Sequence, residues 1–446
     1  MRRVHRQAVD ARGLQPGNPR VSGRHRGRER MTEPAELQKR LELLQGISIF
    51  FTLPDSDMRR LARKLQPRHV ASGEEVVKQG DVADRMHIIV SGRFEVSETW
   101  APHHSVTVAV LGPGDFFGLS AMKGGTPQAA SVTSIEQCEL LELLTDDIDA
   151  VLTEDSPVRD EVERLVEQRR ETIEHLVDRA HEISTSHDGR IIAVYSVKGG
   201  AGKTTLAVNL AAALGQRNRG ECLLLDLGLP YNNAALTANL VPTGSLAANE
   251  RASDAELEEV LLSACIHHPT GMMLLPGSLR IEHSELITPE LVQRSMTALM
   301  RTFPYLVVDL GVAMSEAALS VLERAQRIIL LVTPELSSLK DTKELIELFR
   351  TVLNIPDGSV TLVLNRPRAT SMVDRNDVER SLGRSVDVEL EHDGYRCDRA
   401  AVTGELLVAA FPASPLAKKV KALAMALETE HKAKAKTAPV AEKVAP

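Results

Sequence analysis

The sequence predicts an α/β protein in which a compact β-roll precedes a parallel sheet covered by helices on both faces. Two patterns predict this fold class. From about residue 190 onward, near-continuous apolar runs alternate with helical segments, which is typical of buried parallel strands. From about residue 45 to 150, short runs alternate polar and apolar residues between glycines and prolines, which indicates a β-roll with flanking helices.

The length and the charge limit the kinds of protein that the chain can be. Its 446 residues suggest two or three domains. The formal net charge is −8, and residues 1–30 are rich in arginine, so the remainder is clearly acidic. Such a body attracts neither DNA nor anionic lipid by its overall field, although a local basic patch would. DNA binding is therefore uncertain, and 3% of aromatic residues disfavours RNA reading by stacking.

The cysteines and the apolar runs indicate the compartment. The four cysteines lie far apart and form no C-x-x-C pair. This spacing argues against a zinc site, an iron–sulfur site and a disulfide framework. No apolar run approaches the roughly 20 residues that span a bilayer. We therefore expect a cytoplasmic protein with reduced thiols and no transmembrane segment.

The first 30 residues are polar and rich in arginine, glycine and proline, which predicts a disordered basic tail. Met31 follows this tail directly. Two explanations stay open. Either translation begins at Met31 and residues 1–30 are an artefact of the assigned start, or the tail is a basic arm that binds nucleic acid. The intact mass of the protein would separate them.

The roll is expected over residues 31–152, with a helix before it at about 55–65 and another from about 145. Residues 153–186 then indicate an amphipathic helix, because the apolar side chains of 156–184 fall on one stripe. Such a helix either packs on its own domain as a linker or forms the seam of a dimer. The sequence leaves both alternatives open.

The second domain is expected over residues 187–430. Its apolar strands are RIIAVYSV, ECLLLDL, GMMLLPG, YLVVDLG, RIILLVT and VTLVLNR, and its last helix is expected near 415–430. Residues 431–446 are of low complexity, which predicts a disordered tail. This tail does not suit an amphipathic membrane anchor.

The stretch SVKGGAGKTT, residues 196–205, follows the strand RIIAVYSV and opens the helix TTLAVNLAAAL. A glycine-rich turn between a strand and a helix can surround a phosphate with backbone N–H groups. In this pattern Lys203 reaches the β- and γ-phosphates and Thr204 ligates Mg²⁺. The residues expected to hold the nucleotide are Gly199, Gly200, Ala201, Gly202, Lys203, Thr204 and Thr205.

The pattern K-G-G-x-G-K-T-T resembles the deviant Walker A loop of the MinD/ParA ATPases, which are P-loop NTPases of the SIMIBI type. In that family the extra lysine, here Lys198, crosses a dimer interface to the partner's nucleotide. The resemblance therefore implies a homodimer formed around ATP and Mg²⁺. It extends over about residues 189–427, including ELITPELVQRSMTALMRTFPYLVVDLG and VTLVLNRPR. It is closest to the CpaE/TadZ-like branch, which is associated with pilus assembly and polar localisation.

The resemblance also implies roles for residues outside the loop. Asp309 ends the strand YLVVDLG and matches the Walker B aspartate that holds the Mg²⁺ shell, with Gly311 as the switch beside it. Asn365 ends VTLVLN and matches the residue that reads the adenine base. Asp226 matches the first of two paired aspartates after the second strand. The implied catalytic set is Lys198, Lys203, Asp226 and Asp309, and the implied metal ligands are Thr204 and Asp309.

Two departures from the family pattern bear on mechanism. In ECLLLDLGLP, Gly228 stands where the family has the second aspartate, which positions the attacking water. Without such a group, hydrolysis of the γ-phosphate loses orientation and charge control. ATPase activity is therefore uncertain, and we expect slow or absent turnover. In VELEHDG, Glu391 replaces the proline that borders the adenine, which leaves base specificity less certain than phosphate binding.

The segment GEEVVKQGDVADRMHIIVSGRFEV, with LGPGDFFGLSAMKGGTPQAASV, resembles a cyclic-nucleotide-binding domain over about 100 residues. In that family a glutamate binds the ribose and an arginine binds the cyclic phosphate, and here Leu119 and Gln128 stand at those positions. The loss of the charged partner removes a bidentate contact, and Leu119 adds an apolar group beside the sugar. The degenerate pocket would consist of Gly118, Leu119, Gln128, Ala129 and Ser131. We favour a regulatory or dimerisation roll over a sensor of cyclic nucleotide.

These observations lead to one main hypothesis and two alternatives. The main hypothesis is an ATP-dependent switch that dimerises around ATP and Mg²⁺ and recruits a protein partner of a pilus, polar or secretion machine. The first alternative is an active partitioning ATPase for DNA or a membrane machine. The second is a sensor regulated by cyclic nucleotide. The identity of the partner does not follow from the sequence.

Overall fold

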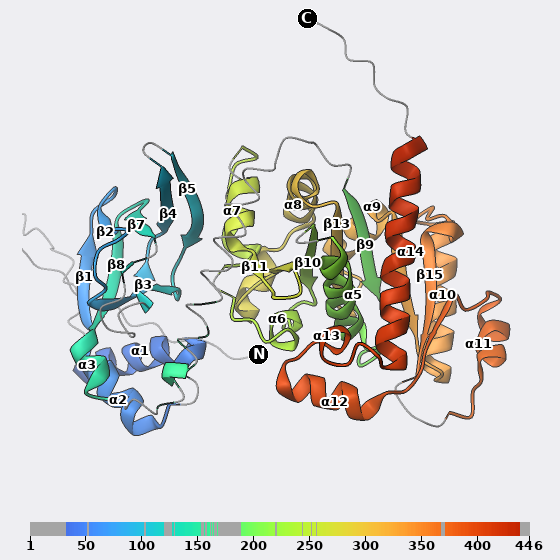
Figure 1. Cartoon of the computed structure of the whole chain (residues 1–446), viewed down its shortest axis with the longest axis horizontal. Coiled ribbons are helices and arrows are strands. Elements are labelled where there is room, and N and C mark those ends of the chain that lie inside the picture. Colours follow the sequence, from blue (N-terminus) through green and yellow to red (C-terminus); the bar gives the residue numbers. More distant parts are fainter. Residues whose placement is uncertain are drawn as a thin grey trace, which may run out of the picture.

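The computed structural model describes residues 33–50, 53–101, 104–119, 127–128, 130–152, 156, 158–160, 162, 164, 167, 189–218, 221–242, 244–250, 252–255, 257–366 and 371–437. Its elements form an N-terminal domain of helices and antiparallel strands and a C-terminal domain built on one large sheet (Figure 1). Within this part of the chain, no helix is long and apolar enough to cross a membrane.

The N-terminal domain contains two four-stranded antiparallel sheets, with the orders β1-β8-β3-β6 and β2-β7-β4-β5. Its helices are α1 (Glu33–Gln45), α2 (Asp55–Lys64) and α3 (Thr145–Asp149), with a 3-10 turn η1 (Ser48–Phe50). Its strands are β1 (Gln66–Val70), β2 (Glu75–Val77), β3 (Arg85–Ser91), β4 (Phe94–Ala101), β5 (His104–Leu111), β6 (Phe116–Phe117), β7 (Ser131–Ser134) and β8 (Cys138–Leu144).

Two apolar clusters hold this domain together. One contains Phe94, Phe117 and Leu140, which are buried between strands of the roll. The other joins the helices to the roll, since Leu44 of α1 and Leu61 of α2 are fully buried with side chains of β3 and β8. The helices and the roll therefore share one continuous packing contact, and movement of either is transmitted to the other.

The C-terminal domain contains an eight-stranded sheet with the order β11-β12-β10-β13-β9-β14-β15-β16. Its strands are β9 (Arg190–Tyr195), β10 (Cys222–Leu227), β11 (Ile266–His267), β12 (Met272–Pro276), β13 (Tyr305–Leu310), β14 (Arg327–Val332), β15 (Val360–Asn365) and β16 (Val388–Leu390). All neighbouring strands run parallel except β11, which is antiparallel to β12. The central strands are buried along their whole length because helices cover both faces.

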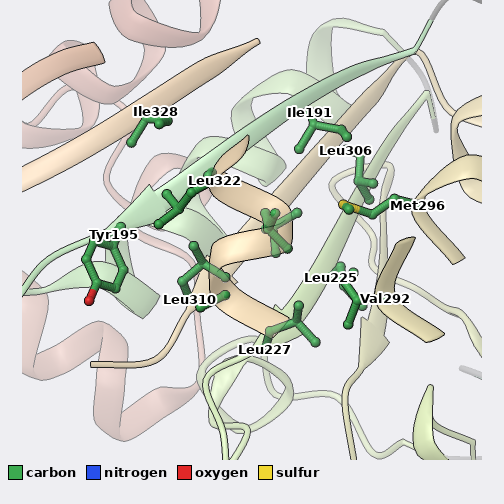
Figure 2. Close-up of a cluster of buried hydrophobic side chains, with 14 of the residues drawn as sticks. Ile191, Tyr195, Leu225, Leu227, Val292, Met296, Leu306, Leu310, Leu322 and Ile328 are labelled. Carbon is green, nitrogen blue, oxygen red and sulfur yellow. The ribbon is translucent and has the colours of Figure 1, made fainter. Parts of the chain in front are cut away.

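The helices of this domain are α5 (Lys203–Arg217), α6 (Ala234–Thr237), α7 (Leu257–Ala264), α8 (Pro289–Thr302), α9 (Glu316–Arg324), α10 (Leu336–Thr351), α11 (Arg375–Leu382), α12 (Gly394–Thr403), α13 (Leu407–Ala410) and α14 (Pro415–Thr437). Short 3-10 turns are η3 (Ala247–Asn249), η4 (Ile281–Leu286) and η5 (Asp357–Ser359). Figure 2 shows one face of the sheet, where strand side chains such as Leu225 and Leu306 meet Val292 and Met296 of α8 and Leu322 of α9. Helices α5 and α14 pack on the other face.

The predicted fold class is confirmed: a parallel sheet covered on both faces follows an antiparallel roll with flanking helices. The structure adds the antiparallel edge strand β11 and the helix α1. The last helix, expected to end near residue 430, continues to Thr437. The helix expected over 156–184 lies mostly outside the described residues, although Val158 and Val162 are buried in the cluster that contains Leu44. Residues 1–30 lie outside the described residues.

The strand order places several loops at one edge of the sheet. Strands β9, β10, β13 and β15 run parallel, so their carboxyl ends meet at the same edge. The chain leaves β9 and passes over β13 to form β10, so the order reverses beside β9. In open α/β sheets this point is the usual location of a ligand.

Candidate functional site

The glycine-rich loop, residues 196–202, joins β9 to α5 at this edge. Gly200 and Gly202 have φ angles of +72° and +90°, a left-handed conformation that favours glycine. A Cβ atom at Gly202 would lie 2.8 Å from Asn365 Nδ2. The same Nδ2 donates a hydrogen bond to the Ala201 carbonyl at 2.9 Å. The end of β15 therefore supports the loop through Asn365, and the reading of the adenine base by this residue stays a prediction.

Lys203 begins helix α5 and points into the protein. Its side chain is nearly buried, and Nζ donates to the Lys198 carbonyl at 3.3 Å. Burial lowers the pKa of Lys203, and the negative charge of Asp309 opposes this shift. A buried ammonium at a helix N-terminus is suited to a phosphate, because the phosphate supplies negative charge next to two positive groups.

Lys198 lies on the outer side of the loop and contacts the segment before α10. Its Nζ lies 3.0 Å from Glu335 Oε2 and donates to Ser337 Oγ at 2.5 Å. The Lys198 side chain is 34% exposed and that of Glu335 41% exposed. In this conformation Lys198 is therefore bound within its own subunit. An ion pair this exposed is worth about 0.2–1 kcal/mol, so the lysine can leave it at little cost.

Two aspartates stand side by side at the ends of β10 and β13. The register of the parallel strands pairs Asp226 directly with Asp309. Asp226 is fixed by backbone donors: Oδ1 accepts from Gly228 N at 2.9 Å, and Oδ2 accepts from Ala234 N at 2.8 Å. Both oxygens of Asp309 are buried and accept no hydrogen bond of regular geometry. The site thus contains one anchored carboxylate and one unsatisfied carboxylate.

The environment raises the pKa of both carboxyl groups. Burial raises the pKa of Asp226, and the two backbone hydrogen bonds oppose the rise. Burial and then the charge of Asp226 raise the pKa of Asp309 to about 7, while the nearby Thr204 hydroxyl and Lys203 oppose it. Two buried carboxylates this close do not both ionise easily unless a bound cation offsets their charge. The pair is therefore incomplete electrostatically.

Gly228 occupies the space beside this pair. A Cβ atom at Gly228 would lie 2.9 Å from Asp226 Oδ1 and 3.8 Å from Asp309 Oδ2. The first distance is shorter than any relaxed contact, and Asp226 Oδ1 is itself held by the Gly228 amide. The backbone is thus arranged for glycine at this position, and no side chain of residue 228 approaches the expected γ-phosphate.

The residues present fit a Mg²⁺ ion that arrives with a nucleotide. Asp309 offers two unsatisfied oxygens near the Thr204 hydroxyl, and Mg²⁺ in nucleotide sites uses one or two carboxylates together with substrate phosphates. Among the described residues, no group of three or more His, Cys, Asp or Glu side chains is arranged to hold a metal ion. A Mg²⁺ ion here would therefore be held jointly by oxygens of the protein and by phosphate oxygens of the nucleotide.

A cavity of about 190 Å³ lies next to the loop and is lined by Gly202, Thr205, Asn365, Glu391 and Asp393 among others. Because Asn365 Nδ2 is engaged with Ala201, its side-chain oxygen is the group left to accept from a base. Asp393 Oδ1 accepts from Arg396 Nη1 at 2.8 Å, whereas its buried Oδ2 has no partner. The cavity therefore offers acceptor oxygens at the position where the resemblance implied a base.

Leu119 and Gly118, two residues of the expected cyclic-nucleotide pocket, are both closely surrounded by other residues of the roll. Leu119 is buried in the cluster of the helices, with Leu61 and Met86, rather than lining an open space beside a sugar. Its effect on a ribose is therefore indirect, because its side chain forms part of the core. Gly118 has a φ angle of +82°, and a Cβ atom there would lie 2.5 Å from the Arg85 carbonyl.

Gln128 lines a separate cavity of about 280 Å³, together with Arg68, Lys78, Arg85 and His87. Both arginines are already paired: they share Glu142 at about 3 Å, and each has a second carboxylate, Glu74 for Arg68 and Asp84 for Arg85. The hydrogen bond from His87, followed by that from Arg68, lowers the pKa of Glu142 to about 2. Burial lowers the pKa of His87.

The remaining residues of the expected pocket are either engaged or undescribed. Ser131 Oγ accepts from Gln79 N at 3.1 Å, so this hydroxyl already has a partner in the protein. Ala129 lies outside the described residues. In the described part of the roll, the two arginines of the Gln128 cavity are therefore already paired, whereas Lys78 forms no ion pair and the Ser131 hydroxyl can still donate.

Sequence reasoning missed three residues that shape the site. Glu335 and Ser337 bind Lys198, and their only sequence signal is the polar run after the strand RIILLVT. Asp393 is partly buried in the base cavity, and its signal is the acidic cluster in VELEHDG. The contacts of Lys198 do not follow from spacing, because they join two loops that are far apart in the sequence.

The geometry defines a P-loop nucleotide-binding protein, and comparisons with known proteins agree. Residues 67–155 match the family model of the cyclic nucleotide-binding domain, and residues 189–358 match the family model of an AAA domain. A structure of a ParA family ATPase from Chlorobium tepidum aligns with a TM-score of 0.50 and 26% identity, covering 54% of this chain and 98% of that one.

Two sequence relatives extend this result. The septum site-determining protein MinD of Thermotoga maritima is 26% identical over 208 residues, 44% of this chain and 73% of that protein. The cAMP-dependent protein kinase regulatory subunit of Dictyostelium discoideum is 38% identical over 105 residues, 23% of this chain. This match covers only 32% of the regulatory subunit. The chain thus joins a cyclic nucleotide-binding domain to a MinD/ParA-type P-loop NTPase domain, which confirms the identification made from the sequence.

Proposed function

We propose that the protein is an ATP-binding switch that dimerises around ATP and Mg²⁺ and in this form localises or assembles a protein partner. The proposal places it in the cytoplasm, in the CpaE/TadZ-like branch, with a partner from a pilus, polar or secretion machine. Hydrolysis is weak or absent, and the N-terminal roll is regulatory or helps to form the dimer. The MinD/ParA class of the C-terminal domain supports the nucleotide dependence.

One observation carries the proposal. The buried ammonium of Lys203, the helix N-terminus and the unsatisfied carboxylate of Asp309 meet at one edge of the sheet, next to Thr204. Each group lacks a partner that a nucleotide triphosphate with Mg²⁺ would supply. When bound, Mg²⁺ would neutralise phosphate charge, while Lys203 orients the β- and γ-phosphates and Thr204 and Asp309 hold the metal.

The proposed weakness of hydrolysis rests on Gly228. No carboxylate stands at this position to orient a water, and the 2.9 Å approach of a hypothetical Cβ to Asp226 Oδ1 leaves no room for one without rearrangement. Asp226 is a poor substitute, because both of its oxygens already accept backbone hydrogen bonds. Positioning of the nucleophile typically contributes a factor of about 10²–10⁴, and this contribution is missing.

The proposed dimer depends on Lys198. To reach a second subunit, Lys198 must leave Glu335 and Ser337, and the nucleotide of the partner would replace these contacts. The test is light scattering of the purified protein with Mg²⁺ and a non-hydrolysable ATP analogue. We expect the mass to change from one to two chains in the wild type and to stay at one chain in Lys198→Ala.

The matched control for this test is Lys419→Ala, which removes an exposed lysine on α14 and should dimerise like the wild type. Binding of fluorescent mant-ATP to the Lys198→Ala variant should persist, because Lys203 and the loop are unchanged. An unchanged mass of the wild type with every nucleotide, despite tight ATP binding, would remove dimerisation from the proposal. ATP turnover above about 1 s⁻¹ would remove the second part, since ordinary enzymes reach 1–10³ s⁻¹.

For the roll, the partnered state of its polar groups favours a regulatory role without cyclic nucleotide. Ser131 Oγ already accepts a hydrogen bond, and the guanidinium groups of Arg68 and Arg85 are already paired with carboxylates. Calorimetry with cAMP, cGMP and cyclic dinucleotides tests this part separately. We expect no heat of binding below millimolar ligand, and micromolar binding of cAMP would establish the roll as a sensor.

A further inference from the structure

A segment after β10, residues 228–241, connects the nucleotide site to the N-terminal domain. It starts at Gly228 beside the aspartate pair and contains the short helix α6. Asn232 and Asn239 have φ angles of +45° and +53°, and only three non-glycine residues in the described ranges have positive φ. Asparagine is the non-glycine residue type that adopts this conformation most readily, so both turns suit the sequence of the segment. The position of the segment depends on the contacts at its two ends.

The first connection runs through α6. Ala234 N donates to Asp226 Oδ2 at 2.8 Å, so the start of α6 is tied directly to the site. At the other end, Arg164 Nη1 donates to the Asn239 carbonyl at 3.0 Å and to Asn239 Oδ1 at 2.5 Å. Arg164 follows Val158 and Val162, which are buried in the apolar cluster of the N-terminal domain. Val241 packs on the apolar cluster that contains the helices of the N-terminal domain. Hydrogen bonds thus tie the start of α6 to Asp226 and the residues after α6 to Arg164.

The second connection runs through the loop after β12. Gly277 N donates to the Asp226 carbonyl at 2.8 Å, and Asn232 Nδ2 donates to Ser278 Oγ at 3.0 Å. A Cβ atom at Gly277 would lie 2.6 Å from that same carbonyl, so this contact requires glycine. The loop after β12 is therefore joined to both Asp226 and the segment 228–241.

Arg280, in the same loop, reaches the N-terminal domain. A Cβ atom at Gly114 would lie 2.5 Å from Arg280 Nη2, and one at Gly46 would lie 3.5 Å from it. The guanidinium thus fits between the end of α1 and the turn before β6, where both positions lack a side chain. That turn leads directly into Phe117, Gly118 and Leu119, the start of the degenerate pocket.

We propose that the N-terminal domain sets the conformation of segment 228–241 through Arg164 and Arg280, and that it thereby controls the position of Asp226 and, through it, how Asp309 receives Mg²⁺ with the nucleotide. The inference rests on the proposed binding of ATP and Mg²⁺. The two connections meet at one residue, Asp226, whose side chain joins the first and whose carbonyl joins the second. A shift of the N-terminal domain therefore moves the carboxylate that faces Asp309.

The expected coupling has a sign. In the described arrangement Asp309 is free to accept a metal ion while Asp226 is anchored, so this is the arrangement ready for Mg²⁺. Loss of the two arginine contacts populates other conformations of the segment, and the apparent affinity falls by the fraction that remains competent. Coupling between sites is commonly about 5–150-fold, and by linkage Mg²⁺ with ATP must in turn stabilise the interface.

The test uses the full chain with Arg164→Ala and Arg280→Ala combined. The matched control combines Arg324→Ala and Arg350→Ala, since the side-chain hydrogen bonds of both arginines lie inside the C-terminal domain. Hydrogen exchange of peptides over residues 226–241 should rise about fivefold or more in the first variant and stay unchanged in the control. This measurement needs no nucleotide, so it is independent of the proposed function.

The second measurement compares the affinity for mant-ATP with and without Mg²⁺. The gain in affinity from Mg²⁺ should fall about fivefold in the Arg164/Arg280 variant, while the affinity without Mg²⁺ stays unchanged. Unchanged exchange, or faster exchange with an unchanged Mg²⁺ gain, would overturn the proposal. If the wild type binds no ATP at all, the proposed function fails, and the exchange result then decides only whether the segment is held.

A third measurement keeps the test decisive if the double variant is unstable. In the wild type, Mg²⁺ and ATP should slow hydrogen exchange of residues 44–47 and 112–115, the two segments of the N-terminal domain that lie beside the Arg280 guanidinium. ATP without Mg²⁺ should leave this exchange unchanged. Equal protection by both ligands, or protection by neither, would contradict control through Asp226 and the metal-binding carboxylate of Asp309.

Discussion

At the scale of single residues, the site contains the groups needed to bind a nucleotide, but at Gly228 it lacks the carboxylate that would orient a water for hydrolysis. The glycine-rich loop predicted Lys203 and Thr204, and the family resemblance implied Asp309; the parallel strands bring these residues to one edge of the sheet. The contacts of Lys198 with Glu335 and Ser337 were not predictable. They depend on side-chain directions in two loops, which no pattern in the sequence records.

A first prediction concerns Gly228. Gly228→Asp restores the carboxylate of the family, but its Cβ meets Asp226 Oδ1 at 2.9 Å and adds a third negative charge. Overpacking of this kind costs about 1–3 kcal/mol, so urea unfolding without nucleotide should show that loss. The folded fraction should hydrolyse ATP at least tenfold faster than the wild type, because a carboxylate can now orient water.

The control for this variant is Gly228→Ala, which introduces the same Cβ without a carboxylate. It should lose similar stability and keep the slow turnover of the wild type. Equal rates in both variants would mean that the missing aspartate does not limit hydrolysis.

A second prediction concerns pH. Burial and Asp226 raise the pKa of Asp309 to about 7, so below this pH the folded protein holds a proton that Mg²⁺ must displace. The gain in ATP affinity from Mg²⁺ should therefore rise about tenfold per pH unit below 7 and level off above it. Without ligand, the stability of the folded protein changes with pH in the opposite direction. The folded state binds more protons than the unfolded state between about pH 4 and 7, so the free energy of unfolding falls as the pH rises.

Titration of the Mg²⁺ gain by mant-ATP binding between pH 5.5 and 8.5 checks this prediction. The affinity of free ATP for Mg²⁺ in the same buffers corrects for protonation of the nucleotide. In Asp309→Asn the gain should be small at every pH. A wild-type gain that does not change with pH would place the pKa of Asp309 near its ordinary value.

At the scale of elements, the strands of the large sheet were predictable because continuous apolar runs admit few other structures. The runs ECLLLDL and YLVVDLG became β10 and β13, each buried at every residue. The strand β11 was missed, since Ile266–His267 is too short to carry a period. The end of α14 was misplaced because its last turns contain alanine and lysine, which favour a helix without an apolar stripe.

A third prediction concerns the attachment of α14. Arg190, which begins β9, is 3% exposed and pairs with Glu430 at 2.7 Å, and Arg327 of β14 pairs with the same carboxylate at 2.6 Å. Glu430→Gln leaves a buried guanidinium without its counter-ion. Loss of a buried pair costs about 3–5 kcal/mol, and the 31% exposure of Glu430 reduces this to about 1–3 kcal/mol.

Urea unfolding monitored by circular dichroism measures this cost. The control is Glu344→Gln on α10, whose pair with Lys340 is exposed on both sides, and its effect should stay within about 0.5 kcal/mol. Equal losses in the two variants would show that α14 is held by its apolar face alone.

At the scale of the whole molecule, the sequence established two domains and their classes but not their relation. The contacts of Arg164 with Asn239 and of Arg280 with Gly46 and Gly114 join residues far apart in the chain. Their partners are backbone carbonyls and glycines, which leave no charge pattern to detect. The helix over 156–184, for which the sequence left two roles open, lies mostly outside the described residues, so its role as linker or dimer seam stays a prediction.

The eight-stranded sheet also has a feature that bears on solubility. Its two outermost strands, Ile266–His267 and Val388–Leu390, are the shortest in the sheet, with 2 and 3 residues. Unpaired edges of long strands are templates on which other chains add strands and aggregate, and short edges offer few free hydrogen-bonding groups for this. Lateral growth into filaments through the sheet is therefore disfavoured. The nucleotide-dependent dimer that we propose would accordingly form through the loops beside the nucleotide site rather than through an edge of the sheet.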